Sequence, residues 1–139
     1  MHQAAALLIF MYLFSSATLA DSHSVFGTFL TQEGTSRVEI ADCGDGSPCG
    51  TVVWIDPASL ANGATPETLK TRSTGEPVLG LRMLSGFSRS KSDWRGGTIY
   101  SPKADKSYGS RLKRLDEETL EVKGCIGFIC QTQIWTLAP

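Results

Sequence analysis

The chain has 139 residues, with 13 Lys and Arg against 14 Asp and Glu, which gives a formal net charge of −1. Hydrophobic residues make up 41% and charged residues 19%, a balance that is typical of a globular protein and excludes a disordered one. Proteins that mainly bind nucleic acid carry a clear basic surplus, and this chain carries none. We therefore expect a single globular domain with no nucleic-acid partner.

The first twenty residues have the layout of a secretory signal peptide. An almost unbroken apolar run over residues 4–14 precedes small residues that end at Ala20. The run is shorter than the ~20 apolar residues needed to span a bilayer, so cleavage after Ala20 is favoured over a membrane anchor. We expect residues 1–20 to be removed and residues 21–139 to form one domain. That domain is expected to be periplasmic or secreted, with no stable membrane insertion.

Four cysteines form two close pairs in the sequence. Cys43 and Cys49 flank a segment rich in Gly, Asp, Ser and Pro, and Cys125 and Cys130 flank a second short segment. Disulfides persist outside the cytoplasm, and this clustering favours two local bridges among the three possible connectivities. A four-thiolate zinc site is the alternative, but its cysteine pairs are usually closer together, and export removes the reducing conditions that keep thiolates free.

Beyond the signal, short apolar runs alternate with turn clusters, and helical periodicity is scarce. In residues 36–41, for example, Val38 and Ile40 alternate with charged neighbours, as in a strand with one buried face. Residues 56–77 form the one long connection, with a helical turn expected at 67–70. About eight strands joined by short connections predict an all-β barrel or sandwich, and an antiparallel up-and-down barrel is favoured because closure removes exposed edges. The predicted strands cover residues 25–31, 36–41, 50–55, 79–87, 98–100, 107–115, 119–125 and 130–137.

Aromatic side chains are spread over several predicted strands. An eight-stranded barrel has an interior that side chains just fill or that holds one small ligand, so each ring is either core or pocket lining. Strand alternation predicts that Val52 and Trp54 share a face, as do Tyr108, Ser110 and Leu112. The candidate ligand-binding residues are Trp54, Trp94, Tyr100, Tyr108 and Trp135.

Few residues offer catalytic chemistry. The two histidines are His2, within the signal, and His23, near the mature amino terminus, so neither a Ser-His-Asp triad nor a multi-histidine metal site is expected. Acid pairs such as Asp42 with Asp45 or Glu117 with Glu118 lie in predicted turns, where turn chemistry and solubility explain them. We therefore expect no enzyme, no metal and no cofactor.

Basic and glycine-rich stretches also have simple structural explanations. The glycines of Arg95-Gly96-Gly97 fit a strand bend or close packing at a barrel corner better than RNA contact. Arg111 and Lys113 alternate with Leu112 and, with nearby Arg114, are interpreted as a solvated outer face rather than an anion site.

Several motifs occur in an order that resembles one bacterial family. The motifs are Arg37-Val38-Glu39-Ile40, Cys43 with Cys49-Gly50, Val53-Trp54-Ile55, Leu79-Gly80-Leu81, Trp94-Arg95-Gly96-Gly97-Thr98-Ile99-Tyr100, Lys106-Ser107-Tyr108, Gly124-Cys125 and Gln133-Ile134-Trp135. On these motifs the chain resembles the domain of unknown function 2147 family over residues 27–135. This resemblance implies an exported bacterial protein with a lipocalin-like (calycin-like) β-barrel, and it brings no established activity or catalytic residues.

Three positions depart from the family's usual pattern. Members usually open with Gly-x-Trp and end near Trp-x-Arg, and the Trp and Arg of lipocalin-like barrels can stack at the closed end. Here Phe29 and Leu137 occupy these positions, and we expect them to pack together instead. Asp105 stands before Lys106 where a Gly is usual, which affects the expected hairpin geometry.

Two functional hypotheses follow. The first is non-covalent binding of a small hydrophobic or amphipathic ligand inside the barrel. The second is a protein-interaction module with a filled barrel, no ligand, and residues 56–77 as the contact surface. Fold-level analogy alone does not decide between them.

Overall fold

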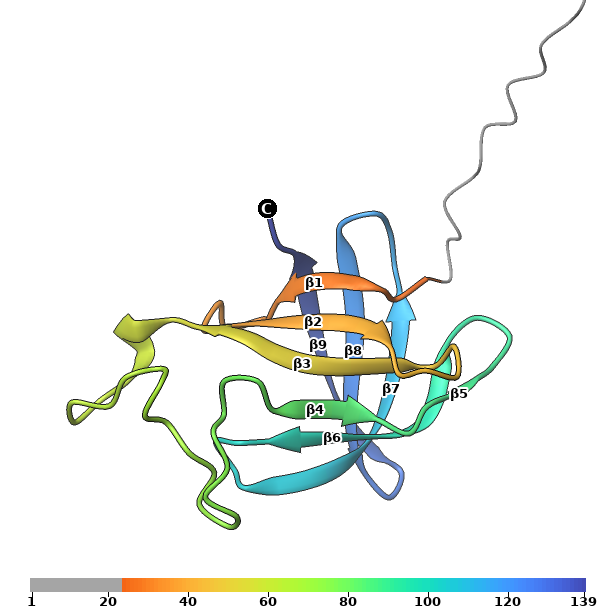
Figure 1. Cartoon of the computed structure of the whole chain (residues 1–139). Coiled ribbons are helices and arrows are strands. Elements are labelled where there is room, and N and C mark those ends of the chain that lie inside the picture. The colour runs from red at the N-terminus through yellow and green to blue at the C-terminus, as the bar shows by residue number, and fades with distance from the viewer. Residues whose placement is uncertain (1–23) are drawn as a thin grey trace, which may run out of the picture.

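The structure is a computed structural model that describes residues 24–139. The predicted signal peptide, His2 and His23 lie outside the described residues. The regular secondary structure of the described part is almost entirely β-strand (Figure 1). Its elements are β1 (Gly27–Leu30), β2 (Ser36–Asp42), β3 (Pro48–Ile55), the short 3₁₀ helix η1 (Pro57–Ser59), β4 (Arg82–Ser85), β5 (Ser88–Arg89), β6 (Trp94–Ser101), β7 (Lys106–Arg114), β8 (Thr119–Ile126) and β9 (Ile129–Leu137).

Eight of these strands close into an antiparallel barrel. The sheet order is β4-β3-β2-β1-β9-β8-β7-β6-β5, and pairing of β4 with β6 closes the ring. In Figure 1, β2 and β3 run across β8 and β9 of the other wall. The two-residue strand β5 pairs with β6 alone. The prediction of an all-β, up-and-down barrel of about eight strands is confirmed.

Successive strands run in opposite directions, so alternate connections meet at the same end of the barrel. We call one end the open end: it carries the turns after β1, β6 and β8 and the long loop, residues 56–81, between β3 and β4. The closed end carries the turns after β2 and β7 and the connection from β4 to β6.

Several strand boundaries differ from the sequence prediction. Strand β6 begins at Trp94 rather than at residue 98, because a β-bulge between Trp94 and Gly97 lets pairing with β7 continue past the glycines. An added Cβ on Gly97 would lie 2.3 Å from the Phe87 ring, so close packing explains this glycine, as predicted. One turn lies slightly earlier than the helical turn expected at residues 67–70. In it the Leu69 amide donates to the Thr65 carbonyl (3.0 Å).

Buried side chains fill the half of the barrel toward the closed end. Inward-facing apolar residues from seven of the eight barrel strands and the flanking segments meet there, and removing this area from water is the main stabilising contribution. The cluster consists of Val25, Phe29, Val38, Ile40, Leu84, Phe87, Leu112, Leu120, Val122 and Trp135, with Met83, Trp94 and Ile99 packed against it.

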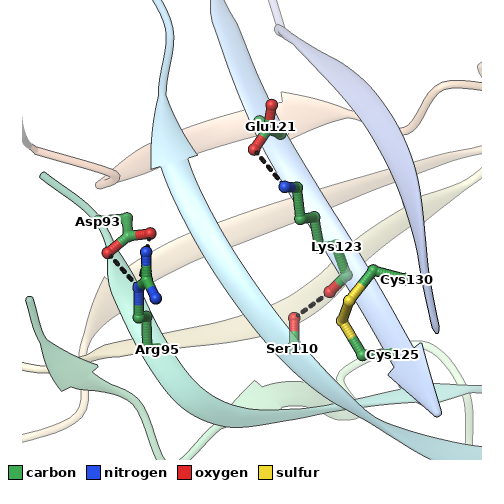
Figure 2. A network of polar contacts seen from close by, with 7 residues as sticks. All are labelled: Asp93, Arg95, Ser110, Glu121, Lys123, Cys125 and Cys130. Carbon is green, nitrogen blue, oxygen red and sulfur yellow. Dashed lines mark hydrogen bonds and ion pairs between the residues drawn. A yellow bond between two sulfur atoms is a disulfide. The ribbon is translucent and has the colours of Figure 1, made fainter. Parts of the chain in front are cut away.

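Both predicted local disulfides are present. Cys43 is bonded to Cys49 across the turn after β2, and Cys125 to Cys130 across the β8–β9 hairpin (Figure 2). No cysteine within residues 24–139 is free, which excludes the four-thiolate zinc alternative. Figure 2 also shows the buried Ser110 hydroxyl donating to the Lys123 carbonyl (2.8 Å), so this polar group in the core has a partner.

Arg114 caps the closed end. Its guanidinium carbon lies 5.1 Å from the centre of the buried Phe29 ring. Its Nε donates to the Asp116 carbonyl (2.6 Å), and a terminal nitrogen donates to the Glu117 carbonyl. Phe29 is also the cross-strand partner of Leu137, as expected from the apolar pair. The interpretation of Arg114 as part of a solvated face was wrong, because the last residue of β7 turns over the end of the barrel.

Candidate binding cavity

The open half of the barrel contains a cavity of about 460 Å³. The strands form its floor, the long loop forms one wall, and the turns after β1 and β6 form the remaining rim. The floor and walls are mainly apolar: Val52, Ile55, Leu60, Leu69, Val78, Met83, Ile99 and Trp135. The rim is mainly polar and includes Thr31, Glu33, Thr35, Ser36, Ser59, Lys70, Tyr100, Ser101, Lys103 and Gln133.

Trp135 separates the filled half of the barrel from the cavity. It is 1% exposed, belongs to the core cluster and also lines the cavity floor. Its indole Nε1–H donates to the Gln133 side-chain oxygen (2.8 Å). Because this partner satisfies the buried N–H, the ring presents an apolar surface to the cavity at no hydrogen-bonding cost.

The long loop is anchored to the barrel as a second, smaller apolar cluster. Val52, Ile55 and Val78 are buried together, and Leu60, Leu69, Leu79 and Met83 pack against them. Backbone hydrogen bonds fix the loop: the Val78 amide donates to the Leu69 carbonyl (3.0 Å), and the Gly80 amide donates to the Val52 carbonyl (2.7 Å). The wall of the cavity is therefore an ordered part of the fold.

At its start the loop is held by a helix cap. The side chain of Asp56 accepts a hydrogen bond from the Ala58 amide (3.0 Å), and Pro57 occupies the first turn of η1. Both features are favourable at a helix start. This places Ser59 and Leu60 at the cavity.

A hydrogen-bond network ties the far part of the loop to the β6–β7 turn. The Asp105 carboxylate accepts from the Tyr100 hydroxyl and from the Ser73 hydroxyl (2.8 Å), and Arg72 donates to the Lys103 carbonyl (2.9 Å). These hydrogen bonds to the charged carboxylate lower the pKa of Asp105. The same carboxylate holds the phenol proton and raises the pKa of Tyr100.

The network explains the unusual residue in this turn. Asp105 has φ of +53°, the left-handed conformation that the usual Gly of the family pattern would adopt freely. Asp is among the few other residues that tolerate it. Here the side chain that replaces Gly links the rim of the cavity to the loop.

The predicted aromatic residues do not gather in one place. Tyr100 and Trp135 line the cavity, and Trp54, Trp94 and Tyr108 lie outside the set of lining residues. Trp94 packs against the core cluster, with the Arg89 guanidinium 5.8 Å from its ring centre. Tyr108 does share an inward row with the buried Ser110 and Leu112, as predicted.

The prediction that Val52 and Trp54 share a face was wrong. Val52 pairs with Val38 while Trp54 pairs with Arg37, so Val53 is an extra residue in a β-bulge that breaks the two-residue alternation. As a result Trp54 lies on the outer face, where the Arg37 guanidinium covers it at 4.8 Å from the ring centre.

The aliphatic wall of the cavity was not predicted from the sequence. Leu60, Leu69 and Val78 lie in or just after a loop interpreted as having no periodic pattern, yet all three pack on the barrel. Isolated apolar residues at wide spacing in an otherwise polar loop were the available signal.

Other kinds of site find little support in residues 24–139. They contain no group of three or more His, Cys, Asp or Glu side chains placed to hold a metal ion. Within the same residues, no helix has both the length and the apolar character needed to cross a membrane.

Comparison with known proteins agrees with the barrel fold. The chain is similar to protein HP1028 from the human pathogen Helicobacter pylori, described as belonging to the lipocalin family, with 21% identity, a TM-score of 0.65 and coverage of 84% of each chain. At this identity the likeness shows the fold alone. No curated protein matches the chain. The family described as "Uncharacterized protein conserved in bacteria (DUF2147)" matches residues 27–137, which include every strand of the barrel. The chain therefore belongs to the DUF2147 family of uncharacterized bacterial proteins, and its fold is a lipocalin-like barrel.

Proposed function

We propose that this protein binds a small apolar or amphipathic molecule, without covalent chemistry, in the cavity at the open end of the barrel. The observation that carries the proposal is the half-filled interior. A cavity of about 460 Å³ lies above Trp135, within the range of ~300–1,000 Å³ that small-molecule sites occupy. The rival hypothesis is an interaction module with a filled barrel, and it does not explain this cavity.

The lining suggests how such a molecule would lie. Its apolar part would contact Val52, Met83 and Ile99, where burial of apolar surface provides affinity of ~25 cal/mol per Å² before the costs of binding. A polar end would reach the rim, where Lys70 and Lys103 offer cationic donors among hydroxyl groups. The charges favour an amphipathic ligand over a purely apolar one.

The proposed setting is outside the cytoplasm, in the periplasm or the medium. Two disulfides and no free cysteine among residues 24–139 support this setting, since such bonds persist under oxidising conditions. A carrier role rather than catalysis is part of the proposal.

Gentle extraction followed by native mass spectrometry tests the proposal. We expect a co-purifying small molecule, released when the protein is denatured. Tryptophan emission provides a second readout: a panel of lipids and hydrophobic dyes should change the emission of Trp135, and the change should be absent in Trp135→Phe but retained in Trp54→Phe, whose ring lies outside the cavity. No bound molecule together with no emission change across the panel would falsify the proposal.

A further inference from the structure

The tip of the β8–β9 hairpin exposes three large apolar side chains. Ile126 is 71% exposed, Ile129 is 79% exposed, and Phe128 is fully exposed. Together with Gly127 they form what we call the apolar tip, residues 126–129. Isolated exposed apolar residues are ordinary, but three at one protruding end mark an interaction site.

The apolar tip is held rigidly. Ile126 and Ile129 are cross-strand partners, and the Cys125–Cys130 disulfide closes the ladder at the next pair (Figure 2). Gly127 has φ of +58°, as a two-residue hairpin turn with glycine first requires. The turn needs a glycine at position 127, whereas a polar residue at position 128 would fit the turn as well as Phe does. The side chain of Phe128 is fully exposed and is therefore not buried against the barrel.

The charge around the tip is sparse and basic. Lys123 is the one ionisable side chain between residues 122 and 139, and its Nζ lies 3.6 Å from the Glu121 carboxylate. The β6–β7 turn, at the same end of the barrel, carries Lys103 and Lys106, and the Asp105 carboxylate in that turn is held by Tyr100 and Ser73. The other acidic residues of this end, Glu33, Asp56, Glu67 and Glu76, belong to the β1–β2 turn and the long loop.

The shape of the tip favours a lipid surface as its partner. A convex apolar point would need a matching socket on a protein, whereas the boundary between headgroups and acyl chains deforms around it. The lysines at this end of the barrel would add attraction to anionic headgroups. We propose that the apolar tip docks the protein reversibly on a membrane surface by inserting Ile126, Phe128 and Ile129 into the interfacial layer.

Docking would also orient the cavity. The tip and the turns that rim the cavity are connections at the same end of the barrel, so docking through the tip would bring that end of the barrel nearer to the lipid. The docking proposal stands on the tip alone; where ligand binding also holds, the membrane becomes the source or the destination of the ligand.

Vesicle flotation tests the docking. The purified chain is mixed with vesicles of phosphatidylethanolamine and phosphatidylglycerol, or of phosphatidylcholine alone, and the fraction that floats is measured. We expect flotation with both compositions, stronger with the anionic one. Phe128→Ser should reduce partitioning about tenfold or more, since it removes the largest of the three apolar side chains that would enter the lipid. Residues 1–23 are the same in every variant, so differences between variants report the tip.

Two further variants sharpen the test. Leu115→Ser removes an apolar side chain of 45% exposure at the closed end and should float like the unmodified chain. Phe128→Trp should shift its emission to the blue when vesicles are added. Circular dichroism should show that all variants remain folded. Binding of a hydrophobic dye, measured without vesicles, reports separately on the cavity.

Three results would overturn the proposal. The first is no flotation with either composition. Capture of an envelope protein by a cross-linker at position 128, without flotation, would count as the same result. The second is equal flotation of Phe128→Ser and the unmodified chain, which would assign any binding to the lysines. The third is unchanged emission of Phe128→Trp.

Discussion

The guanidinium carbon of Arg114 lies 5.1 Å from the centre of the Phe29 ring and covers it at the closed end of the barrel. In the family pattern, an aromatic residue of the first strand and an Arg of the last strand are available for this stacking. Here the first strand keeps an aromatic ring, the last strand supplies Leu137, and the cation comes from the end of β7. The closed end is thus plugged by an ion–ring contact from a different strand.

Replacing Arg114 by Met should destabilise the protein. Both the contact with Phe29 and the hydrogen bonds to the turn after β7 are lost, and we expect the free energy of unfolding to fall by about 1–3 kcal/mol. Urea unfolding measures the change. The matched control is Lys113→Met, an exposed neighbour that should change stability by less than about 0.5 kcal/mol. Equal effects of the two substitutions would contradict the role given to Arg114.

Gly97→Ala should overpack the core. Its new Cβ would lie 2.3 Å from the Phe87 ring, so we expect destabilisation of about 1–3 kcal/mol. The control is Gly109→Ala, whose Cβ would meet nothing closer than 3.6 Å. Thermal unfolding of both variants and of the double variant Gly97→Ala with Phe87→Leu checks this. Failure of the smaller side chain at position 87 to recover stability would argue against the steric cause.

The Tyr100–Asp105 contact should make the loop's anchoring depend on pH. The pKa of Asp105 is lowered from its usual 3.8, so its stabilising contribution is complete above that value and is lost as the pH falls through the lowered pKa. The pKa of Tyr100 is raised from its usual 10.0, so its contribution is complete below that value and is lost as the pH rises through the raised pKa. Ultraviolet titration of the phenols should show one group that ionises at higher pH in the unmodified chain than in Asp105→Asn. Coincident titrations would show that the hydrogen bond does not form.

The backbone at position 105 allows a separate test. Asp105→Gly should relax the left-handed backbone but release the loop, whereas Asp105→Ala should lose the tether and keep the strain. We expect limited proteolysis within residues 56–81 to be faster in both variants. The alanine variant should also be less stable than the glycine variant, by about 1 kcal/mol. Unchanged proteolysis in both would remove the tethering role.

The two disulfides should contribute separately. Each closes a short loop, for which the chain-entropy relation gives about 2 kcal/mol. Replacing Cys43 and Cys49 together by Ser, or Cys125 and Cys130 together, should each lower the unfolding free energy by about that amount and leave the circular dichroism spectrum unchanged. Loss of the barrel on removal of one bond would mean that the core cluster is insufficient without it.

Much of the barrel could be predicted because its signals are local. The alternation of Val38 and Ile40, and the pairing of Cys125 with Cys130 across a hairpin, follow from spacing within one or two strands. The face on which Trp54 lies could not be predicted. One bulge residue in β3 moves each later residue of that strand to the opposite face of the sheet.

The cavity was harder to predict than the strands. Its wall depends on contacts of Leu69 and Val78 with Val52, which are far apart in sequence and joined through an irregular loop. The cap formed by Arg114 has the same origin, since a cation at the end of one strand meets a ring of another strand that is distant in sequence. Tertiary contacts of this kind leave no periodic pattern.

Filling the cavity is the sharpest test of whether the open half of the barrel holds a ligand. Ser36 is a small residue of β2 that lines it, so Ser36→Trp should occupy the space, whereas Leu115→Trp at the closed end should not. Binding of a fluorescent naphthylamine dye is titrated for the unmodified chain and both variants. We expect one saturable site that Ser36→Trp weakens about tenfold or more and Leu115→Trp leaves unchanged. Equal dye binding by all three proteins, or none by the unmodified chain, would contradict this expectation.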